Sequence, residues 1–477
     1  MIGLANRISF RRSAGILVAL LFLSLFLASC SNESQSPAAG GRPVPVDEPA
    51  TDQKPIPAGK VFADSITYEF AVYFLPKPLQ DPEDVLAGLL KEKYTGFQRV
   101  EKIDESSTDL TLSARLEANP QEHYAPPDAE SLHRFGRGVD PNQAADLQAT
   151  EGAFVLDFRY SSDHVWDGLR QASEIVEALA RNTGGLIWDE TTREVFSPDA
   201  WHEKRLADWG DDVPNVSRHT VIHAYQSGEF IRAITLGMEK FGLPDVIVDG
   251  FSWSVNRNVG HVINLCAQAL AEGQMVGREG EFELDFRKIR NPEVREPQVT
   301  TLKDNATGIA LLTLREGRRE EGDPANRLVE ITFDRGTGPD RHARREQVLI
   351  SAFGSEDSVT AVKHDEAIEA ASRRAKAKLP ALRAAVENGL APGEYIMVKA
   401  PFASPEGERE WMWVEVSEWN GKEIRGLLQN EPFQIPDLHA GQMVAVSEDE
   451  VFDFIRRFPD GKTEGNETGK LIEQQRE

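Results

Sequence analysis

The chain of 477 residues carries 78 acidic against 53 basic side chains, which gives a formal net charge of −25 at pH 7. So acidic a chain repels phosphate backbones and anionic head groups, and this argues against nucleic acid as a partner. Apolar residues make up 40% of the chain, enough for globular cores, and the length is typical of two or three domains.

The first 29 residues have the three parts of a secretory signal. Three arginines lie within the first 12 residues, an apolar run extends from Ile16 to Leu27, and the small residues Ala28 and Ser29 follow it. The alternative, a membrane-spanning helix, needs about 20 consecutive apolar residues, and this run is shorter. Residues 1–29 are therefore predicted to be a signal peptide.

The junction Leu27-Ala28-Ser29-Cys30 resembles the lipobox of bacterial lipoproteins, in which cleavage leaves the cysteine as the new N-terminus. A thiol is the nucleophile that can take a diacylglyceryl group as a thioether. Several acyl chains make a permanent anchor, because each buried methylene contributes about 0.8 kcal/mol. The residue after the cysteine is Ser31 rather than Asp, which resembles the default signal that directs lipoproteins to the outer membrane in enteric-type sorting. The resemblance implies a lipoprotein of the cell envelope, attached to the outer membrane through Cys30 and facing the periplasm.

The one other cysteine, Cys266, lies in an apolar stretch of the sequence. A thiol in such a setting usually behaves as a small buried hydrophobe, whereas a catalytic thiol needs a basic and partly exposed environment. With Cys30 assigned to the lipid, the mature chain is expected to contain no intramolecular disulfide.

Residues 30–60 are rich in Pro, Ser, Gly and acidic residues, which predicts a disordered linker. Over residues 61–275, helical and strand patterns mix without a regular βαβ period and predict an α+β domain. The polar, Pro-bearing stretch 118–149 is expected to be a long loop. Strands are expected at 66–75, 153–158, 219–225, 230–236 and 245–249, and helices at 82–93, 163–181 and 256–271.

From 276 to 360 the helical signal fades, and a strand-rich bridging segment is predicted, with strands at 309–314, 327–333 and 347–353. Residues 361–477 are expected to form a smaller α+β domain with an antiparallel sheet. Its helix over 364–388 contains Pro380, which favours a kink or two shorter helices. Strands are expected at 394–400, 410–418, 423–429 and 442–447, before a closing amphipathic helix at 448–458.

Three segments of this last domain, Glu410 to Val414, Ile424 to Pro432 and Gly441 to Val444, resemble the bacterial family called domain of unknown function 2314. The resemblance extends from about His364 to the end of the chain. Family members often carry an Ile-x-Asp-Trp-like segment near the end, where this chain has Val451-Phe452-Asp453-Phe454. Residues from about 62 to 271 resemble another uncharacterised bacterial family, domain of unknown function 4261. Neither resemblance implies an activity.

Motifs of common enzyme classes are missing from the sequence: there is no Gly-x-Ser-x-Gly, His-Glu-x-x-His or P-loop pattern. His219 and His223 would share a face of a helix and could bind a metal there, but their Thr and Val neighbours favour a strand, on which they lie about 13 Å apart. His164 and His202 stand beside carboxylates in sequence, which is not the geometry of a dyad. We predict no catalytic residue, no metal site and no cofactor.

Trp411 and Trp413 share one face of a predicted strand with Glu415, while Met412, Val414 and Val416 share the other. Aromatic faces bind sugars, peptides and cations, so Trp411, Trp413 and Asn430 are the candidate ligand-binding residues. Packing of the tryptophans in the core is the favoured alternative. Asn430 most simply begins a turn, because Asn tolerates left-handed backbone.

Together these patterns predict a membrane-anchored lipoprotein that binds an unknown protein or small molecule and has no catalytic role. One alternative is an enzyme, such as a hydrolase, whose acidic and histidine groups are brought together only by the fold. A second is an immunity protein against a toxin, because the acidic charge would suit a basic toxin.

Overall fold

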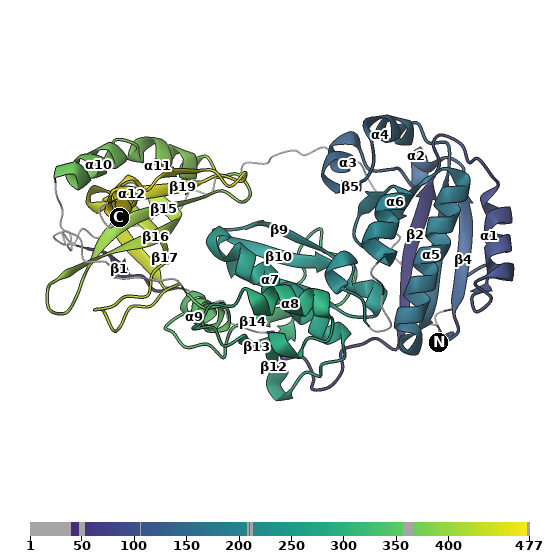
Figure 1. Cartoon of the computed structure of the whole chain (residues 1–477), viewed down its shortest axis with the longest axis horizontal. Helices are drawn as coiled ribbons and strands as arrows, with labels where there is room; N and C mark the ends of the chain where they lie inside the picture. The colour runs from purple at the N-terminus through teal and green to yellow at the C-terminus, as the bar shows by residue number, and fades with distance from the viewer. Residues whose placement is uncertain are drawn as a thin grey trace, which may run out of the picture.

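The computed structural model of the chain describes residues 40–46, 53–104, 106–207, 209, 213–355 and 366–474. Its elements form three sheets that follow one another along the long axis of the molecule, with the N-terminal sheet at one end and the C-terminal sheet at the other (Figure 1). Helices accompany each sheet, which confirms the predicted α+β class. None of the helices in these ranges is long and apolar enough to cross a bilayer.

The N-terminal sheet has seven strands in the order β3-β4-β6-β2-β7-β8-β5. Its central strand β2 (Ser65–Tyr73) pairs antiparallel with β6 (Ala153–Ser161) and β7 (Leu186–Asp189). Helix α5 (Val165–Thr183) packs on one face, and α1 (Pro82–Glu92) packs on α5 (Figure 1). The remaining elements are β3 (Gln98–Arg99), β4 (Thr111–Glu117), β8 (Glu194–Phe196) and α6 (Pro198–Trp201).

The loop predicted for 118–149 is wrong, because this stretch forms three short helices and a strand. Asp128 caps one helix by accepting from Ser131 N, and Asp140 forms a capping box with Gln143 at the start of another. Two of the four prolines in this stretch, Pro120 and Pro141, stand in the first turns of helices, where proline is tolerated. The elements are α2 (Pro120–His123), α3 (Ala129–Phe135), β5 (Gly136–Arg137) and α4 (Pro141–Gln148).

The middle sheet has six strands in the order β12-β13-β14-β11-β10-β9, and only its β11 and β14 pair in parallel. Helix α7 (Asn256–Ala271) packs against β11 and has the bounds predicted for it. The other elements are β9 (Val221–Ser227), β10 (Phe230–Leu236), β11 (Asp245–Phe251), β12 (Glu281–Asp285), α8 (Pro292–Thr300), β13 (Ile309–Glu316) and β14 (Leu328–Thr332).

The strand predicted at 347–353 is wrong, because these residues are the second half of helix α9 (Arg341–Phe353). Asp340 caps this helix by accepting from His342 N and Ala343 N, each at 2.9 Å. The first half of α9 is strongly charged, so the apolar stretch that follows reads as a strand when taken alone. The N-cap and the burial of Val348 and Ala352, four residues apart, account for the helix.

The N-terminal and middle sheets share one hydrophobic core that extends from Val61 to Ala352. The boundary predicted at residue 275 falls inside the middle sheet, since β14 pairs with β11 across it. Residues 61–275 and 276–360 therefore do not form separate units. A domain boundary lies where few contacts cross between the two parts of the chain, and this depends on which strands pair. A change of local sequence pattern does not tell which strands will pair.

The C-terminal sheet has the order β1-β18-β17-β16-β15-β19-β20 and is antiparallel throughout. Two helices, α10 (Glu366–Lys376) and α11 (Leu379–Glu387), cover one face (Figure 1). They are separate because Pro380 stands in the first turn of α11, as its position predicted. The others are β15 (Tyr395–Ala403), β16 (Arg409–Asn420), β17 (Glu423–Leu428), β18 (Met443–Ser447), β19 (Asp453–Arg457), β20 (Thr463–Gly465) and α12 (Glu467–Gln474).

Two predictions for segments that belong to the C-terminal sheet are wrong. The closing helix expected at 448–458 is a single 3₁₀ turn followed by β19, which pairs with β15. The expected linker 30–60 includes strand β1 (Arg42–Pro43), which pairs with Ala445 and Val444 of β18. The edge of β18 offers unpaired backbone groups, and a short segment near the N-terminus satisfies them.

The middle and C-terminal sheets meet around Phe230, at the start of β10. Phe230 packs with Leu427 and Met443 of the C-terminal sheet, and Val44 and Val46 pack against this cluster. The α9 cap Asp340 also contributes, since its second oxygen accepts from Met443 N at 3.4 Å. These contacts place one face of the C-terminal sheet beside the β9–β10 hairpin.

Candidate functional site

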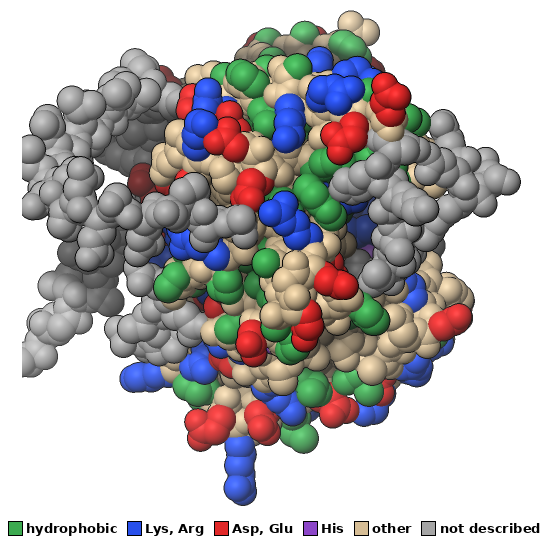
Figure 2. Space-filling model, turned by 90° about the vertical axis from the view of Figure 1, so that its left-hand side faces the viewer, with side chains coloured by type: hydrophobic (Ala, Val, Ile, Leu, Met, Phe, Trp, Pro, Cys, Tyr) green, Lys and Arg blue, Asp and Glu red, His purple; other side chains and the backbone are tan. Residues whose placement is uncertain are grey.

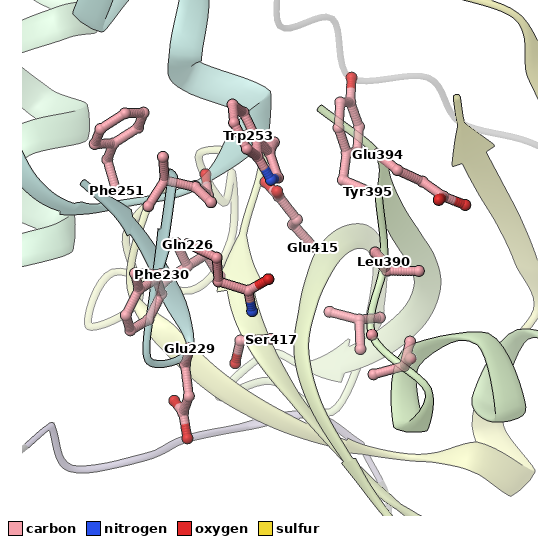
Figure 3. Close-up of a pocket in the computed structure, with 16 residues that line it drawn as sticks. Gln226, Glu229, Phe230, Phe251, Trp253, Leu390, Glu394, Tyr395, Glu415 and Ser417 are labelled. Atoms are coloured by element: carbon pink, nitrogen blue, oxygen red, sulfur yellow. The ribbon is translucent and has the colours of Figure 1, made fainter. Parts of the chain in front are cut away.

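A crevice of about 90 Å³ lies where the middle and C-terminal sheets meet (Figure 3). That space suits a small functional group rather than a whole drug-sized molecule. The middle sheet contributes the β9–β10 turn and the end of β11, and the C-terminal region contributes the end of α11, the start of β15 and the centre of β16. The principal lining residues are Gln226, Glu229, Phe230, Phe251, Ser252, Trp253, Leu390, Glu394, Tyr395, Glu415, Ser417 and Leu427.

Glu415 is a buried carboxylate of this crevice. Its neighbours Val414 and Val416 point into the core beneath α11, so strand alternation turns Glu415 to the opposite face, toward Trp253 (Figure 3). Glu415 is 5% exposed. The Ser254 backbone N–H donates to Oε1 at 3.4 Å, while Oε2 is buried and has no hydrogen-bond partner among the described residues.

Burial raises the pKa of Glu415, and hydrogen bonds from Ser254 and Ser252 partly oppose that rise. The two serine hydroxyls lie 3.0 Å from each other. A buried carboxylate with an unsatisfied oxygen is costly, because water is lost and only part of the lost solvation is replaced. The crevice therefore contains an acceptor that the described chain leaves unused.

The walls of the crevice are aromatic and acidic. Trp253 follows β11 on a 3₁₀ turn, and Tyr395 begins β15; both line the crevice (Figure 3). Glu229 and Glu394 add two further carboxylates, and Glu394 is paired with Arg456 at 2.6 Å. Among the described residues that line the crevice, none is Lys, Arg or His.

Comparison with known proteins identifies one part of the chain. Residues 365–475 match the family described as an uncharacterized protein conserved in bacteria (DUF2314). This confirms the resemblance drawn from the sequence, and the match covers less than half of the chain. No curated protein and no solved structure matches the chain. The resemblance of residues 62–271 to domain of unknown function 4261 stays a prediction.

The DUF2314 region contributes α10 to α12 and β15 to β20, so the crevice lies at its border. Glu415 and Tyr395 belong to the DUF2314 region, whereas Trp253 and Phe230 come from the middle sheet. Glu415 is the site residue that the sequence does not reveal. The available signal is one carboxylate between Val414 and Val416, and its burial depends on a segment more than a hundred residues earlier in the chain.

The predicted ligand residues of the DUF2314 region lie outside the crevice. Trp411 and Trp413 are half-buried on the face that carries Glu415, and neither is in the core, so the favoured core packing does not hold for them. Asn430 Oδ1 accepts from Trp413 N at 2.8 Å, and Lys399 Nζ lies 5.6 Å from the Trp413 ring centre. The Trp411 ring packs on Phe452, with centroids 4.6 Å apart. The bond from Trp413 to Asn430 thus holds the start of the β17–β18 loop against the sheet.

The remaining residues singled out from the sequence are dispersed. Cys30 lies outside the described residues. Cys266 is buried in α7, and burial raises the pKa of its thiol to about 12, as suits a hydrophobe rather than a nucleophile. His219 is buried next to Trp209, and His223 stacks on Phe135. Within the described ranges, no group of three or more His, Cys, Asp or Glu side chains could hold a metal ion.

A second cluster of ionisable groups joins the N-terminal and middle sheets. Asp189 Oδ2 lies 2.5 Å from Lys240 Nζ and 3.0 Å from Arg205 Nη2, and Arg205 also contacts Glu194 at 3.2 Å. The two cations hold the pKa of Asp189 well below its usual range, and burial lowers the pKa of Lys240 to about 8. All four side chains are at most 2% exposed. A substrate cannot reach them, so the cluster serves packing between the sheets.

A larger hollow, of about 470 Å³, lies between α9 and the β17–β18 loop. Its polar pair is His439 and Glu431, 3.2 Å apart and both largely solvated, a contact that contributes little. On the C-terminal end of the molecule, acidic and basic side chains are interspersed rather than gathered by sign (Figure 2). Among the described residues that line the hollow, none has the buried, unsatisfied polar atom that distinguishes the crevice.

Proposed function

We propose that the protein is a bacterial envelope lipoprotein, anchored to the outer membrane through Cys30, that binds a small ligand without acting on it. The ligand site is the crevice between the middle sheet and the DUF2314 region. The observation that carries the proposal is Glu415, a buried carboxylate with an unpartnered oxygen at the border of two packed units. Pre-formed concave sites between structural units, with few polar groups, are the usual places for ligands.

The composition of the crevice supports binding rather than catalysis. Nucleophilic and acid–base mechanisms need a reactive group and a base within hydrogen-bond reach of each other. The hydroxyls of Ser252 and Ser254 lie 3.0 Å apart and hydrogen-bond to the Glu415 carboxylate, and the described lining contains no His, Lys or Cys that would complete a catalytic set beside them. Glu415 is therefore better suited to hold a ligand group than to exchange protons in a reaction cycle.

The anchor is supported by the signal and the junction at Cys30, and it has a direct test. Mass spectrometry of the native mature protein should find Cys30 at the N-terminus with its acyl modification. Cys30→Ser should leave an unprocessed precursor or a slowly released soluble form. An unmodified Cys30 in the native mature protein would contradict the anchor.

The ligand site can be tested without knowing the ligand. Native mass spectrometry of the protein purified from its own envelope should show a bound small molecule. Ser417→Trp should displace it, because Ser417 lines the crevice and an indole would fill the space. Asn420→Trp, at the exposed end of the same strand, is the matched control and should keep the ligand. A bound molecule that persists in Ser417→Trp would place the ligand elsewhere.

A further inference from the structure

The chemistry around Glu415 specifies the kind of ligand. Oε2 is buried without a partner among the described residues, while Oε1 accepts from Ser254 N at 3.4 Å and the Ser252 and Ser254 hydroxyls lie beside the carboxylate. Buried charges in proteins are normally paired, so the partner that would keep this buried carboxylate ionised is a hydrogen-bond donor that carries positive charge.

The charge of the lining excludes an anion and favours a cation. Glu229, Glu394 and Glu415 line the crevice, and Arg456 neutralises only Glu394. The Ala391 N–H also donates to Glu394, which leaves that carboxylate well satisfied by the protein itself. Two carboxylates thus remain without a cationic side chain in the described lining, and a site with low-dielectric walls of one sign concentrates ions of the opposite sign.

The aromatic walls add a second attraction for the same class of group. Trp253, Tyr395 and Phe230 line the crevice around Glu415 (Figure 3). Ammonium and guanidinium groups bind to the faces of such rings, most strongly to tryptophan and when partly desolvated. The space of about 90 Å³ admits the end of such a ligand and leaves its body outside.

We infer that the crevice binds the terminal ammonium or guanidinium group of a small organic cation, with Glu415 as the counter-ion and Trp253 as the aromatic wall. This inference rests on the proposed function, since it names the ligand class of the same site. The Glu415 carboxylate forms the ion pair, and no covalent step is involved.

The test is a ligand-observed NMR titration of the full-length protein in a non-ionic detergent. The probes are n-butylammonium and n-butylguanidinium, with 1-butanol and butyrate as neutral and anionic counterparts of the same length. The cations should bind saturably, and the other two should not. Glu415→Gln keeps the shape of the side chain and should weaken cation binding at least about thirtyfold, the loss typical of deleting one partner of a buried pair.

Glu418→Gln is the matched control, because Glu418 lies on the same strand, pairs with Arg425 and does not line the crevice. Cation binding should be unchanged in it. Trp253→Leu should weaken cation binding while leaving the fold intact, as checked by circular dichroism, and offers a second route if Glu415→Gln fails to fold.

Cation probes that do not bind, or that bind Glu415→Gln as well as the native chain, would overturn the inference. If 1-butanol or butyrate binds instead and Ser417→Trp abolishes that binding, the ligand site stands and the cation assignment fails. If the co-purified ligand persists in Ser417→Trp, the proposed function itself fails.

Discussion

Asp189→Asn should be among the most destabilising conservative substitutions in this protein. Asn retains an oxygen for the Thr191 and Thr192 contacts, but its amide would face Lys240 and Arg205, which are 2.5 and 3.0 Å from the native carboxylate. Lys240 would then lose its carboxylate, and Arg205 would keep only Glu194, which also pairs with Arg137 and Lys204. Removing one partner of a buried ion pair costs about 3–5 kcal/mol. This is a large part of the free energy of unfolding of a typical protein, about 5–15 kcal/mol.

Asp199→Asn is the control, because Asp199 also meets an arginine, at 2.8 Å, but is 89% exposed. It should cost under about 1 kcal/mol. The assay is urea unfolding followed by circular dichroism, with the free energy taken by linear extrapolation. Adding Lys240→Met to Asp189→Asn should recover at least about 1 kcal/mol, since it removes one unpaired cation. The reasoning is refuted if Asp189→Asn and Asp199→Asn are equally stable.

Three further predictions follow from burial. Trp413→Ala should lower the free energy of unfolding by about 2 kcal/mol, because the ring is half-buried. Met412→Ala should lower it more, by roughly 2–5 kcal/mol, because Met412 is in the core, and urea unfolding of both variants checks the order. Burial and two nearby arginines lower the pKa of His342 to about 2, so acidification from pH 6.5 to 5 should remove about 2 kcal/mol of stability, and a His342→Gln chain should show a flatter pH profile. Residues 364–477 expressed alone should give a folded circular dichroism spectrum, since their core is internal; an unfolded spectrum would show that β1 is essential.

Strong local patterns in the sequence predict most of the regular elements. Helix α7 is found at its predicted bounds because its buried positions recur at helical spacing over four turns. Pro380 likewise separates α10 from α11, since proline cannot occupy a helix interior without removing a hydrogen bond. The resemblance drawn from the Trp, Gly and Asn-x-Pro residues of the DUF2314 region is confirmed by the family match over residues 365–475.

Weak or misleading local patterns account for the wrong elements. The 118–149 helices are too short to show a period, and only their caps distinguish them from a loop. In α9 the charged first half hides the helix, and residues 448–458 have an amphipathic pattern but pair as β19 with β15. In each case a cap or a distant strand decides between two conformations that local propensity leaves nearly equal.

Strand alternation alone determined that Glu415 and the two tryptophans share one face of β16, because successive side chains on any strand point to opposite sides. Only the tertiary structure decided what covers that face. Glu415 is buried in the crevice that Trp253 and Phe230 also line, while Trp411 and Trp413 stay half-exposed. The physical reason is that sequence periodicity reports only to which side of the strand a side chain points. The burial of Glu415 comes from segments that pack against β16 from elsewhere in the chain, and this burial causes its raised pKa and leaves one of its oxygens without a partner among the described residues.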